Sequence, residues 1–503
     1  MEKVKQYLKT IDEVIAKGPY TDTWESLSAH TLPKWYHDAK FGIFIHWGVY
    51  SVPAFGNEWY SRRMYLKGDA CYEHHIQTYG PQKEFGYKDF IPLFKAEKFD
   101  AAEWADLFQK AGAKFVMPVA EHHDGFQMYD SDLSEWCASK MGPKKDVVGL
   151  LGQELAKRDI VLTASSHRIE HYWFMSGGRE FDSDMPEEIP YGDLYWPSVR
   201  PPFERPAGEN GALPPGIPLG QEAVSGFDVD PEFMEDWLAR TCEIVDKYRP
   251  KILYFDWWIQ VEPMKPYLRK FAAYYYNRAA EWGEEVTINY KNDAFSYGTA
   301  TRDIERGQLA DISADFWQND TSVAKNSWGY TEGNDYKDPS EIIADLVDVV
   351  SKNGSLLLNI GPKSDGTIPD EDRHILLEIG KWLSVNGEGI YGTDHWKKYG
   401  EGPTLTPEGH FTDTLRKSFT AEDFRFTYKP GVLYVFAMKW PEDGVVRIHT
   451  LGRDNRKFNG VIRKAEILGY DGEVKHVLCG DYLTVMAEGI SSRTPVCIKL
   501  TID

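Results

Sequence analysis

The stretch AAEWADLFQKAGAKFVMPVAEHH, residues 101–123, joins a helical pattern to a strand pattern with only a short turn between them. Its first half spaces apolar residues as one face of a helix does, and its second half is a continuous apolar run typical of a strand buried on both faces. The run ends at the polar residues Glu121, His122 and His123. A helix that leads directly into a buried strand is the repeating unit of a parallel sheet covered by helices.

The same unit recurs along the chain and favours one large α/β fold. Helical patterns cover residues 101–113, 146–159, 231–248, 271–283 and 339–354. Strand patterns cover residues 41–48, 114–122, 160–166, 251–258, 285–290, 311–317 and 355–362. An open nucleotide-binding sheet would carry G-x-G-x-x-G after its first strand, and the segment after residue 48 has no such motif. We therefore predict a (β/α)8-like barrel.

The pattern changes near residue 395, which divides the chain into two expected domains. After that position the helical spacing stops, and short alternating strands with turn signals such as KPG (429–431) and YDG (470–472) follow. We predict a (β/α)8-like barrel domain over residues 1–395 and a C-terminal β-sandwich over residues 396–503.

One segment of the expected barrel, residues 176–226, breaks the alternation. It holds nine prolines between Pro186 and Pro218 and no periodic pattern. Because it follows the strand at 160–166, we expect it as a long loop on the C-terminal face of the barrel, where active sites are built. Tyr191, Tyr195 and Trp196 either form a substrate-facing rim there or belong to a packed structural insert.

Charge and composition exclude several classes of function. The chain has 57 basic and 78 acidic residues, a formal net charge of -21, which argues against nucleic acid or a membrane surface as a partner. Five separated cysteines without a C-x-x-C pair encode neither a disulfide framework nor a zinc site. No run of 18 apolar residues and no apolar leader occurs. We expect a cytoplasmic protein as written, or a periplasmic or secreted one if an export signal has been removed.

Polar residues gather where the expected strands end, and in a barrel such ends converge on one pocket. They are His46, Glu121, His122, His123, Asp124, Ser166, His167, Glu170, Asp256 and Asn289. The histidines lack metal-binding spacing such as H-E-x-x-H, so no metal and no cofactor is expected, and neutral imidazoles suit sugar hydroxyls. Glu58 and Trp59 in GNEWY indicate a hydroxyl ligand and a stacking platform, or packing behind the pocket.

Asp256 in KILYFDWW (251–258) stands at the end of a buried run without a basic neighbour beyond Lys251. A carboxylate held ionised there could attack an anomeric carbon while a second carboxyl group protonates the leaving oxygen. The second carboxyl group is not fixed by spacing, and Glu305, flanked by arginines, could equally form a structural ion pair. The candidates, most expected on loops, are Glu58, Asp293, Asp303, Glu305, Asp315 and Asp320.

Four stretches resemble the α-L-fucosidases of glycoside hydrolase family 29 over nearly the whole expected barrel. They are KWYHDAKFGIFIHWGVYSVPAFGNEWYSRRMY (34–65), FVMPVAEHHDGFQMYDS (115–131), NSWGY (326–330) and LLLNIGPKSDGTIP (356–369). The resemblance implies a (β/α)8-like catalytic domain, a C-terminal β-sandwich and metal-independent, retaining, exo-acting hydrolysis of terminal α-L-fucosides. It implies a fucosylated oligosaccharide or glycoconjugate as substrate. The sequence does not fix the oligomeric state, and a homo-oligomer is one alternative.

The resemblance also carries residue roles onto this sequence. Asp256 matches the nucleophile and Glu305 the acid/base, with Glu58 as runner-up. Gln318 stands where a glutamate is common, which removes one rival acid. The fucose-binding set is implied to be His46, Glu58, Trp59, His122, His123, His167, Tyr254 and, near the sugar methyl group, Trp328. The alternatives are a catalytically weak fucose-binding barrel, or a hydrolase of a related sugar such as an α-L-galactoside.

Overall fold

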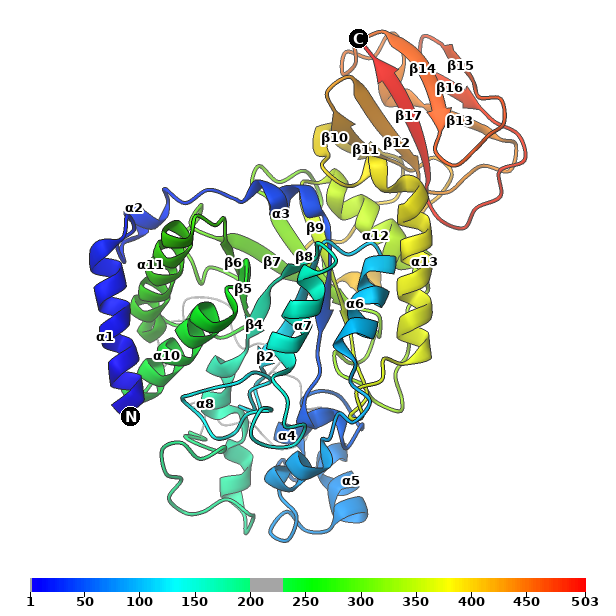
Figure 1. Cartoon of the computed structure of the whole chain (residues 1–503). Helices are drawn as coiled ribbons and strands as arrows, with labels where there is room; N and C mark the ends of the chain where they lie inside the picture. The colour runs from blue at the N-terminus through cyan, green and yellow to red at the C-terminus, as the bar shows by residue number, and fades with distance from the viewer. Residues whose placement is uncertain (1, 200–228) are drawn as a thin grey trace.

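The computed structural model of the protein describes residues 2–199 and 229–503 and contains a closed parallel barrel (Figure 1). Each strand pairs in parallel with its neighbours, and β1 pairs with both β9 and β2, which closes the ring. β3 and β4 both pair with β2 and are two halves of one barrel strand, so the predicted (β/α)8-like fold is confirmed. The strands are β1 Phe41–Ile45, β2 Phe115–Glu121, β3 Val161–Leu162, β4 Ala164–Ser166, β5 Ile252–Phe255, β6 Thr287–Tyr290, β7 Thr301–Glu305, β8 Trp317–Ser322 and β9 Gly354–Ile360.

Helices cover much of the outside of the barrel, and aspartates start several of them. Asp100, Asp146, Asp230 and Asp338 each accept a hydrogen bond from a first-turn backbone N–H, which satisfies groups that a helix N-terminus leaves free. The longer helices are α1 Glu2–Lys17, α5 Ala70–Tyr79, α6 Ala101–Lys110, α7 Val147–Ala156, α10 Pro231–Tyr248, α11 Lys265–Trp282, α12 Pro339–Ser351 and α13 Asp370–Asn386. The short ones are α2 Trp24–Leu27, α3 Lys34–Ala39, α4 Tyr60–Arg63 and α8 His171–Phe174.

The region between β6 and β8 differs from the sequence prediction. The strand predicted over 311–317 is wrong: residues 311–316 lie outside any strand, and β8 begins at Trp317. The preceding strand β7 has the sequence TRDIE and was missed, because it lacks the apolar run of a buried strand. Asp303 and Glu305 therefore lie on β7 and Asp320 lies on β8, not on loops.

The inside of the barrel carries a buried polar network that explains why β7 is so charged. Lys291, directly after β6, is fully buried, and its Nζ lies 2.6 Å from Asp303 and 2.9 Å from Asp320. Gln318 donates to Asp303 over 2.7 Å and accepts from the hydroxyl of Tyr36 over 2.7 Å. Each of these contacts satisfies a polar group that water does not reach, which makes charged residues tolerable on inward-facing strand positions.

Two antiparallel sheets follow the barrel and form the lobe at the upper right of Figure 1. Side chains from both sheets share one hydrophobic cluster, among them Val435, Ile498, Leu483 and Val485. The five-stranded sheet holds β10 Asp394–Glu401, β11 Phe424–Lys429, β12 Val432–Ala437, β17 Val496–Ile502 and β14 Ile462–Ile467, and the three-stranded sheet holds β13 Val445–Ile448, β16 Leu483–Met486 and β15 Lys475–Leu478. We propose the division into domains at residue 395, close to the start of β10.

The proline-rich segment 176–226 is described only as far as residue 199, and its remainder lies outside the described residues. Tyr195 is fully buried, and its hydroxyl contacts Asp184 and the hydroxyl of Tyr65. Tyr191 donates to Asp236 over 2.9 Å, and the ring of Trp196 is largely buried. These aromatic residues belong to a packed insert, and the alternative of a substrate-facing rim is not supported for them.

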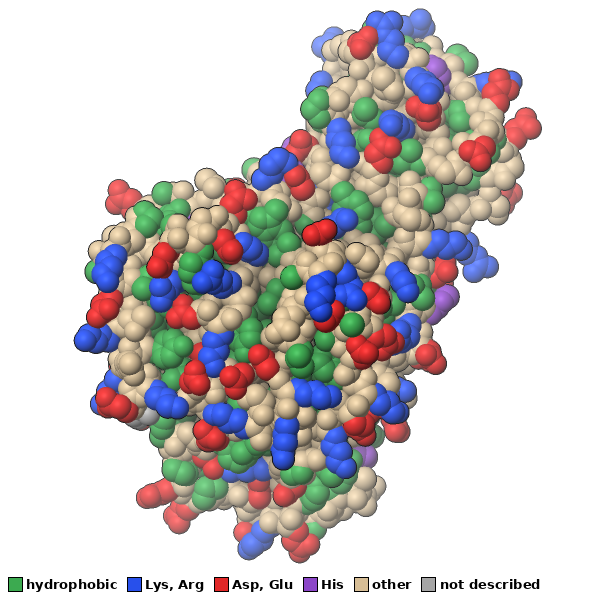
Figure 2. All heavy atoms as spheres, viewed as in Figure 1, with side chains coloured by type: hydrophobic (Ala, Val, Ile, Leu, Met, Phe, Trp, Pro, Cys, Tyr) green, Lys and Arg blue, Asp and Glu red, His purple; other side chains and the backbone are tan. Residues whose placement is uncertain are grey.

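Acidic and basic side chains are interspersed over the visible face of the molecule (Figure 2). Within the described residues, no helix combines the length and apolar character needed to cross a bilayer.

A buried charge cluster joins the barrel to the C-terminal sheets. Asp348 on α12 contacts Arg425 on β11, and its other oxygen lies 2.6 Å from Lys352 Nζ. Thr406, from the segment after β10, also donates to this carboxylate over 3.2 Å. Burial raises the pKa of Asp348, but the two cations outweigh it and lower the pKa to about 2. This carboxylate therefore stays ionised and holds α12 against β11.

Asp348→Ala should destabilise the protein by about 3–5 kcal/mol, because two buried cations lose their shared counter-ion. Urea unfolding followed by far-UV circular dichroism measures the change, and Glu13→Ala, at an exposed helical ion pair, should shift the midpoint little. The wild-type advantage should be present above the unfolded aspartate pKa near 4 and disappear as the pH falls toward 2. An Asp348→Ala midpoint equal to that of the wild type would contradict this role.

Candidate active site

Asp256 directly follows β5 and lies at the C-terminal end of the barrel strands, next to two histidines. Its Oδ2 is 3.0 Å from His167 Nδ1 and 3.4 Å from His123 Nε2. Burial raises the pKa of Asp256, but the contacts with His167 and His123 outweigh this and hold the pKa well below its usual range. The apolar run before Asp256 thus ends in a carboxylate that is ionised at neutral pH.

His123 is the cation that balances this carboxylate. Its Nδ1 lies 3.3 Å from Glu170 and its Nε2 faces Asp256. Burial lowers the pKa of His123, but the charge of Glu170 and the interaction with Asp256 together raise it to about 9. At neutral pH an imidazolium therefore donates to Asp256, and the positive charge stays inside a buried cluster.

His46, His122 and His167 form a group of neutral imidazoles beside this pair. Ring nitrogens of the three lie within 4.8 Å of one another, a spacing that suits either the hydroxyls of one small ligand or a metal ion. Burial is the main cause that lowers the pKa of each ring. Asn359 Oδ1 accepts from His46 Nδ1 over 2.7 Å, which leaves His46 Nε2 as a hydrogen-bond acceptor.

Glu58 holds the backbone of the NSWGY segment. Its Oε2 accepts hydrogen bonds from the N–H of Trp328 over 2.8 Å and from the hydroxyl of Ser327 over 3.1 Å. The Trp328 ring lies 5.1 Å from the ring of His46, and the guanidinium of Arg306 lies 4.7 Å from its centre on the ring face. Glu58 therefore fixes an aromatic wall beside the imidazoles.

Trp59 and Tyr254 complete the contacts around Asp256 and His123. The ring of Trp59 lies edge-on to that of His123 at 5.8 Å. The hydroxyl of Tyr254 donates to Asp320 over 3.1 Å and lies 3.5 Å from Asp256 Oδ1. The eight residues expected to bind substrate therefore form one connected network around Asp256, which Glu58 joins through Trp328 and His46.

Glu305, the last residue of β7, is a buried carboxyl group of the opposite character. Trp257, the residue after Asp256, donates its indole N–H to Glu305 Oε2, and Lys291 Nζ lies 3.3 Å from the same oxygen. Burial raises the pKa of Glu305, the charge of Lys291 opposes this, and Asp320 and Asp256 add to the rise, so that the pKa is about 7. One carboxyl group is thus ionised and its neighbour retains a proton near neutral pH, which is the pattern of a nucleophile and a general acid.

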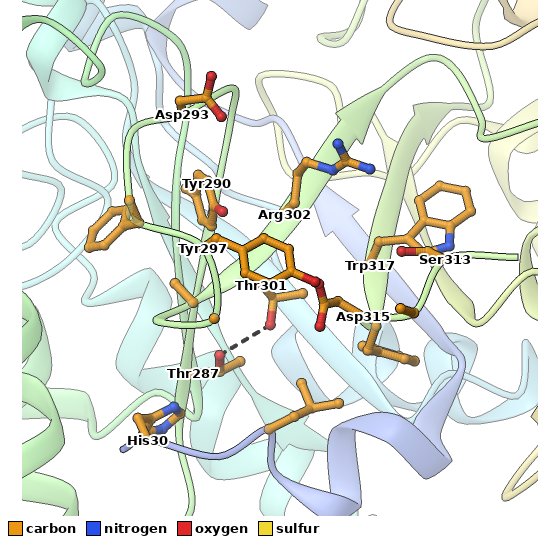
Figure 3. Close-up of a pocket in the computed structure, with 16 residues that line it drawn as sticks. His30, Thr287, Tyr290, Asp293, Tyr297, Thr301, Arg302, Ser313, Asp315 and Trp317 are labelled. Carbon is orange, nitrogen blue, oxygen red and sulfur yellow. Dashed lines mark hydrogen bonds between the residues drawn. The ribbon is translucent and has the colours of Figure 1, made fainter. Parts of the chain in front are cut away.

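The other candidates for the second carboxyl group lie elsewhere. Asp303 and Asp320 are bound to Lys291 inside the barrel. Asp293 and Asp315 line a separate cavity of about 350 Å³ with Tyr297 (Figure 3). Apart from these two aspartates, the cavity contains none of the expected site residues. It is lined by residues at the starts of β6, β7 and β8, such as Thr287, Thr301 and Trp317, which are also labelled in Figure 3.

Sequence reasoning missed four residues that contact the site. Lys291 and Asn359 follow or end buried strands, so the rule that located His46 and Asp256 could also have found them. The sequence places Trp257 next to Asp256, but it does not indicate the contact of its indole N–H with Glu305. His410, whose Nδ1 accepts a hydrogen bond from the N–H of Glu305 over 3.0 Å, lies 105 positions further along the chain, and no local pattern predicts that contact.

Comparison with known proteins identifies the relatives of this chain. A family model described as Alpha-L-fucosidase matches residues 8–388. The tissue alpha-L-fucosidase of Homo sapiens is 31% identical over 463 residues, which cover 91% of this chain and 85% of that protein. The crystal structure of Thermotoga maritima alpha-fucosidase in complex with fucose is 28% identical with a TM-score of 0.71, and the match covers 96% of this chain and 100% of that one.

Asp256→Asn should lower the pKa of His123 from about 9 and that of Glu305 from about 7, because the charge of Asp256 raises both. The His123 ring protons can be titrated by NMR, and the carboxyl stretch of Glu305 by difference infrared spectroscopy. Glu13→Gln, on the exposed face of α1, serves as the control. Titrations that do not move in Asp256→Asn would show that Asp256 is not coupled to the two groups.

Proposed function

Since the chain belongs to the alpha-L-fucosidase family, we propose that it removes terminal α-L-fucosyl residues with Asp256 as nucleophile and Glu305 as acid/base. It is a glycoside hydrolase. The observation that carries the assignment of residues is the pair of carboxyl groups at the ends of β5 and β7, one held ionised by histidines and the other held protonated by burial. Trp257 links them, since it follows the first and donates to the second.

In the first step Asp256 attacks C1 of the fucosyl residue and the bond from C1 to the leaving oxygen breaks. Glu305 gives its proton to that oxygen, so the leaving group departs as an alcohol and the sugar remains bound as an ester of Asp256. His123 and His167 face the attacking carboxylate and keep it ionised.

In the second step Glu305, now ionised, removes a proton from a water molecule that attacks C1. The ester bond to Asp256 breaks, and fucose leaves with its anomeric configuration retained. Glu305 regains its proton and Asp256 its charge, so both groups return to the states that their surroundings favour.

The proposed binding groups suit a neutral sugar. Uncharged His46, His122 and His167 can donate to and accept from hydroxyl groups, while Trp59 and Trp328 offer apolar ring faces. Fucose combines such hydroxyls with a methyl group, and the membership of the family favours it over an α-L-galactoside. The retained proton on Glu305 argues against a barrel that only binds sugar. The substrate is a fucosylated oligosaccharide or glycoconjugate. One chain supplies every proposed residue, so a second copy is not needed to complete the site.

Asp256→Gly should abolish turnover of an aryl α-L-fucoside while the protein stays folded, because the sugar has no carboxylate to attack its C1. Azide should restore activity and yield a fucosyl azide of inverted configuration, which NMR of the product identifies. Turnover by this variant without azide at more than about one hundredth of the wild-type rate would exclude Asp256 as the nucleophile.

Glu305→Gln should lower kcat by about 10²–10⁴-fold for a fucosylated oligosaccharide and by less for a fucoside with an activated aryl leaving group, which needs less protonation. Because the acid must be protonated, wild-type activity should fall as the pH rises through about 7, and this limb should vanish in Glu305→Gln. Full pH profiles of both substrates measure the effect. Glu58→Gln should keep the limb, and if it removes the limb instead, Glu58 is the acid.

A further inference from the structure

A segment of the C-terminal region, residues 408–413, lies against the end of β7. It belongs to the connection between β10 and β11, yet its backbone forms hydrogen bonds with the backbone of the barrel. The N–H groups of Gly409, Phe411 and Thr412 donate to the carbonyls of Gln308, Glu305 and Arg306 over 2.9, 2.8 and 2.8 Å, respectively. This segment of the C-terminal region therefore lies directly beside the proposed acid, Glu305.

Two further features hold this segment in place. Asp413 lies 2.6 Å from Lys337 Nζ and accepts from the hydroxyl of Thr321 over 3.1 Å, and both partners belong to the barrel region. At Gly307 a Cβ atom would lie 1.7 Å from the carbonyl oxygen of Gly409, so glycine is needed at position 307 for the two segments to come this close. The segment is therefore fixed against β7 and is not a loose loop.

The aromatic rings of this segment reach the two proposed catalytic carboxyl groups through Trp257. The ring of His410 lies 4.9 Å from that of Trp257, and the ring of Phe411 is stacked on Trp257 at 5.8 Å and 16°. Trp257 in turn donates to Glu305. Because Nδ1 of His410 accepts from the N–H of Glu305, the neutral ring carries its proton on Nε2, and no described residue accepts from that atom.

Position 411 is an unusual one for a large apolar side chain such as phenylalanine. It is 54% exposed, and its backbone has φ of 57°, a region that bulky residues avoid. The burial of the side chain cannot account for its presence, and strain of this kind gathers at functional positions. An exposed aromatic face beside a sugar-cleaving carboxyl group is suited to stacking on another sugar ring.

We propose that residues 408–413 form the subsite for the leaving group, in which Phe411 stacks on the first pyranose ring of a neutral glycan. This inference rests on the proposed function, because Glu305 protonates the oxygen that joins fucose to that ring. The leaving group is then placed on the side of Glu305 where Trp257, His410 and Phe411 lie. The preference for one glycan over another is set by this segment, whereas the barrel holds the fucose.

The test compares two substrates in Phe411→Ala and in a control variant. Fucosyl fluoride has no sugar in the leaving group, whereas a fucosylated disaccharide places a pyranose there. Phe411→Ala should lower kcat/KM for the disaccharide about 5- to 10-fold and leave that for the fluoride within about 2-fold. Leu415→Ala, which removes a side chain that is 66% exposed two residues beyond this segment, should change neither.

Further variants separate binding from folding. Phe411→Gly should show the same selective loss with an unfolding temperature equal to or above that of the wild type, because glycine adopts the positive φ without strain. Phe411→Tyr should retain wild-type activity on the disaccharide. An equal loss on both substrates, no loss on the disaccharide, or a lower unfolding temperature for Phe411→Gly would overturn the subsite. A wild-type protein that cleaves neither substrate would overturn the proposed function instead.

Discussion

The ammonium group of Lys291 sits fully buried among three carboxyl groups, and much of the site depends on how that charge is balanced. Its Nζ lies 2.6 Å from Asp303, 2.9 Å from Asp320 and 3.3 Å from Glu305. One buried cation cannot neutralise three carboxylates, and the pKa values of Asp320 and Glu305 are accordingly raised, above all by burial. Lys291 thus allows the inward faces of β7 and β8 to be charged while leaving Glu305 with a proton. His167 and His123 have the opposite effect on Asp256, the residue before Trp257, because they lower its pKa and keep it ionised.

Most of the barrel could be predicted because its buried strands are continuous apolar runs that end in polar residues. The strands β1, β2, β5 and β9 all follow that rule. Four of the site residues come directly after the ends of these strands or one position later, namely His46, His122, His123 and Asp256, and Asn359 is the second-last residue of β9. β7 did not follow it, because its inward positions Asp303 and Glu305 pair with Lys291 rather than with apolar neighbours. A strand stabilised by such charge pairs has no apolar run to mark it, and its partner Lys291 lies in another segment, directly after β6.

The acid side of the site could be predicted only in part. Glu305 came from a resemblance and not from its spacing, and the sequence gives no sign that burial would raise its pKa to about 7. The contacts of His410 and Phe411 with the barrel depend on how a distant connection folds back on β7. Such contacts are set by the packing of two regions, and neither periodicity nor a short motif reports them.

The backbone bonds between residues 409–412 and the end of β7 also impose an order on assembly. A ribosome makes the residues of the barrel first, and domains generally begin to fold from the N-terminal side during synthesis. Asp256 and its histidines can be in place while the β10–β11 connection is still unmade. The N–H of Glu305 has no His410 to accept its hydrogen bond until then. The protein therefore acquires the half of its site that holds the attacking carboxylate before the half that borders the proton donor, and a nascent or truncated chain would hold a site with one open side.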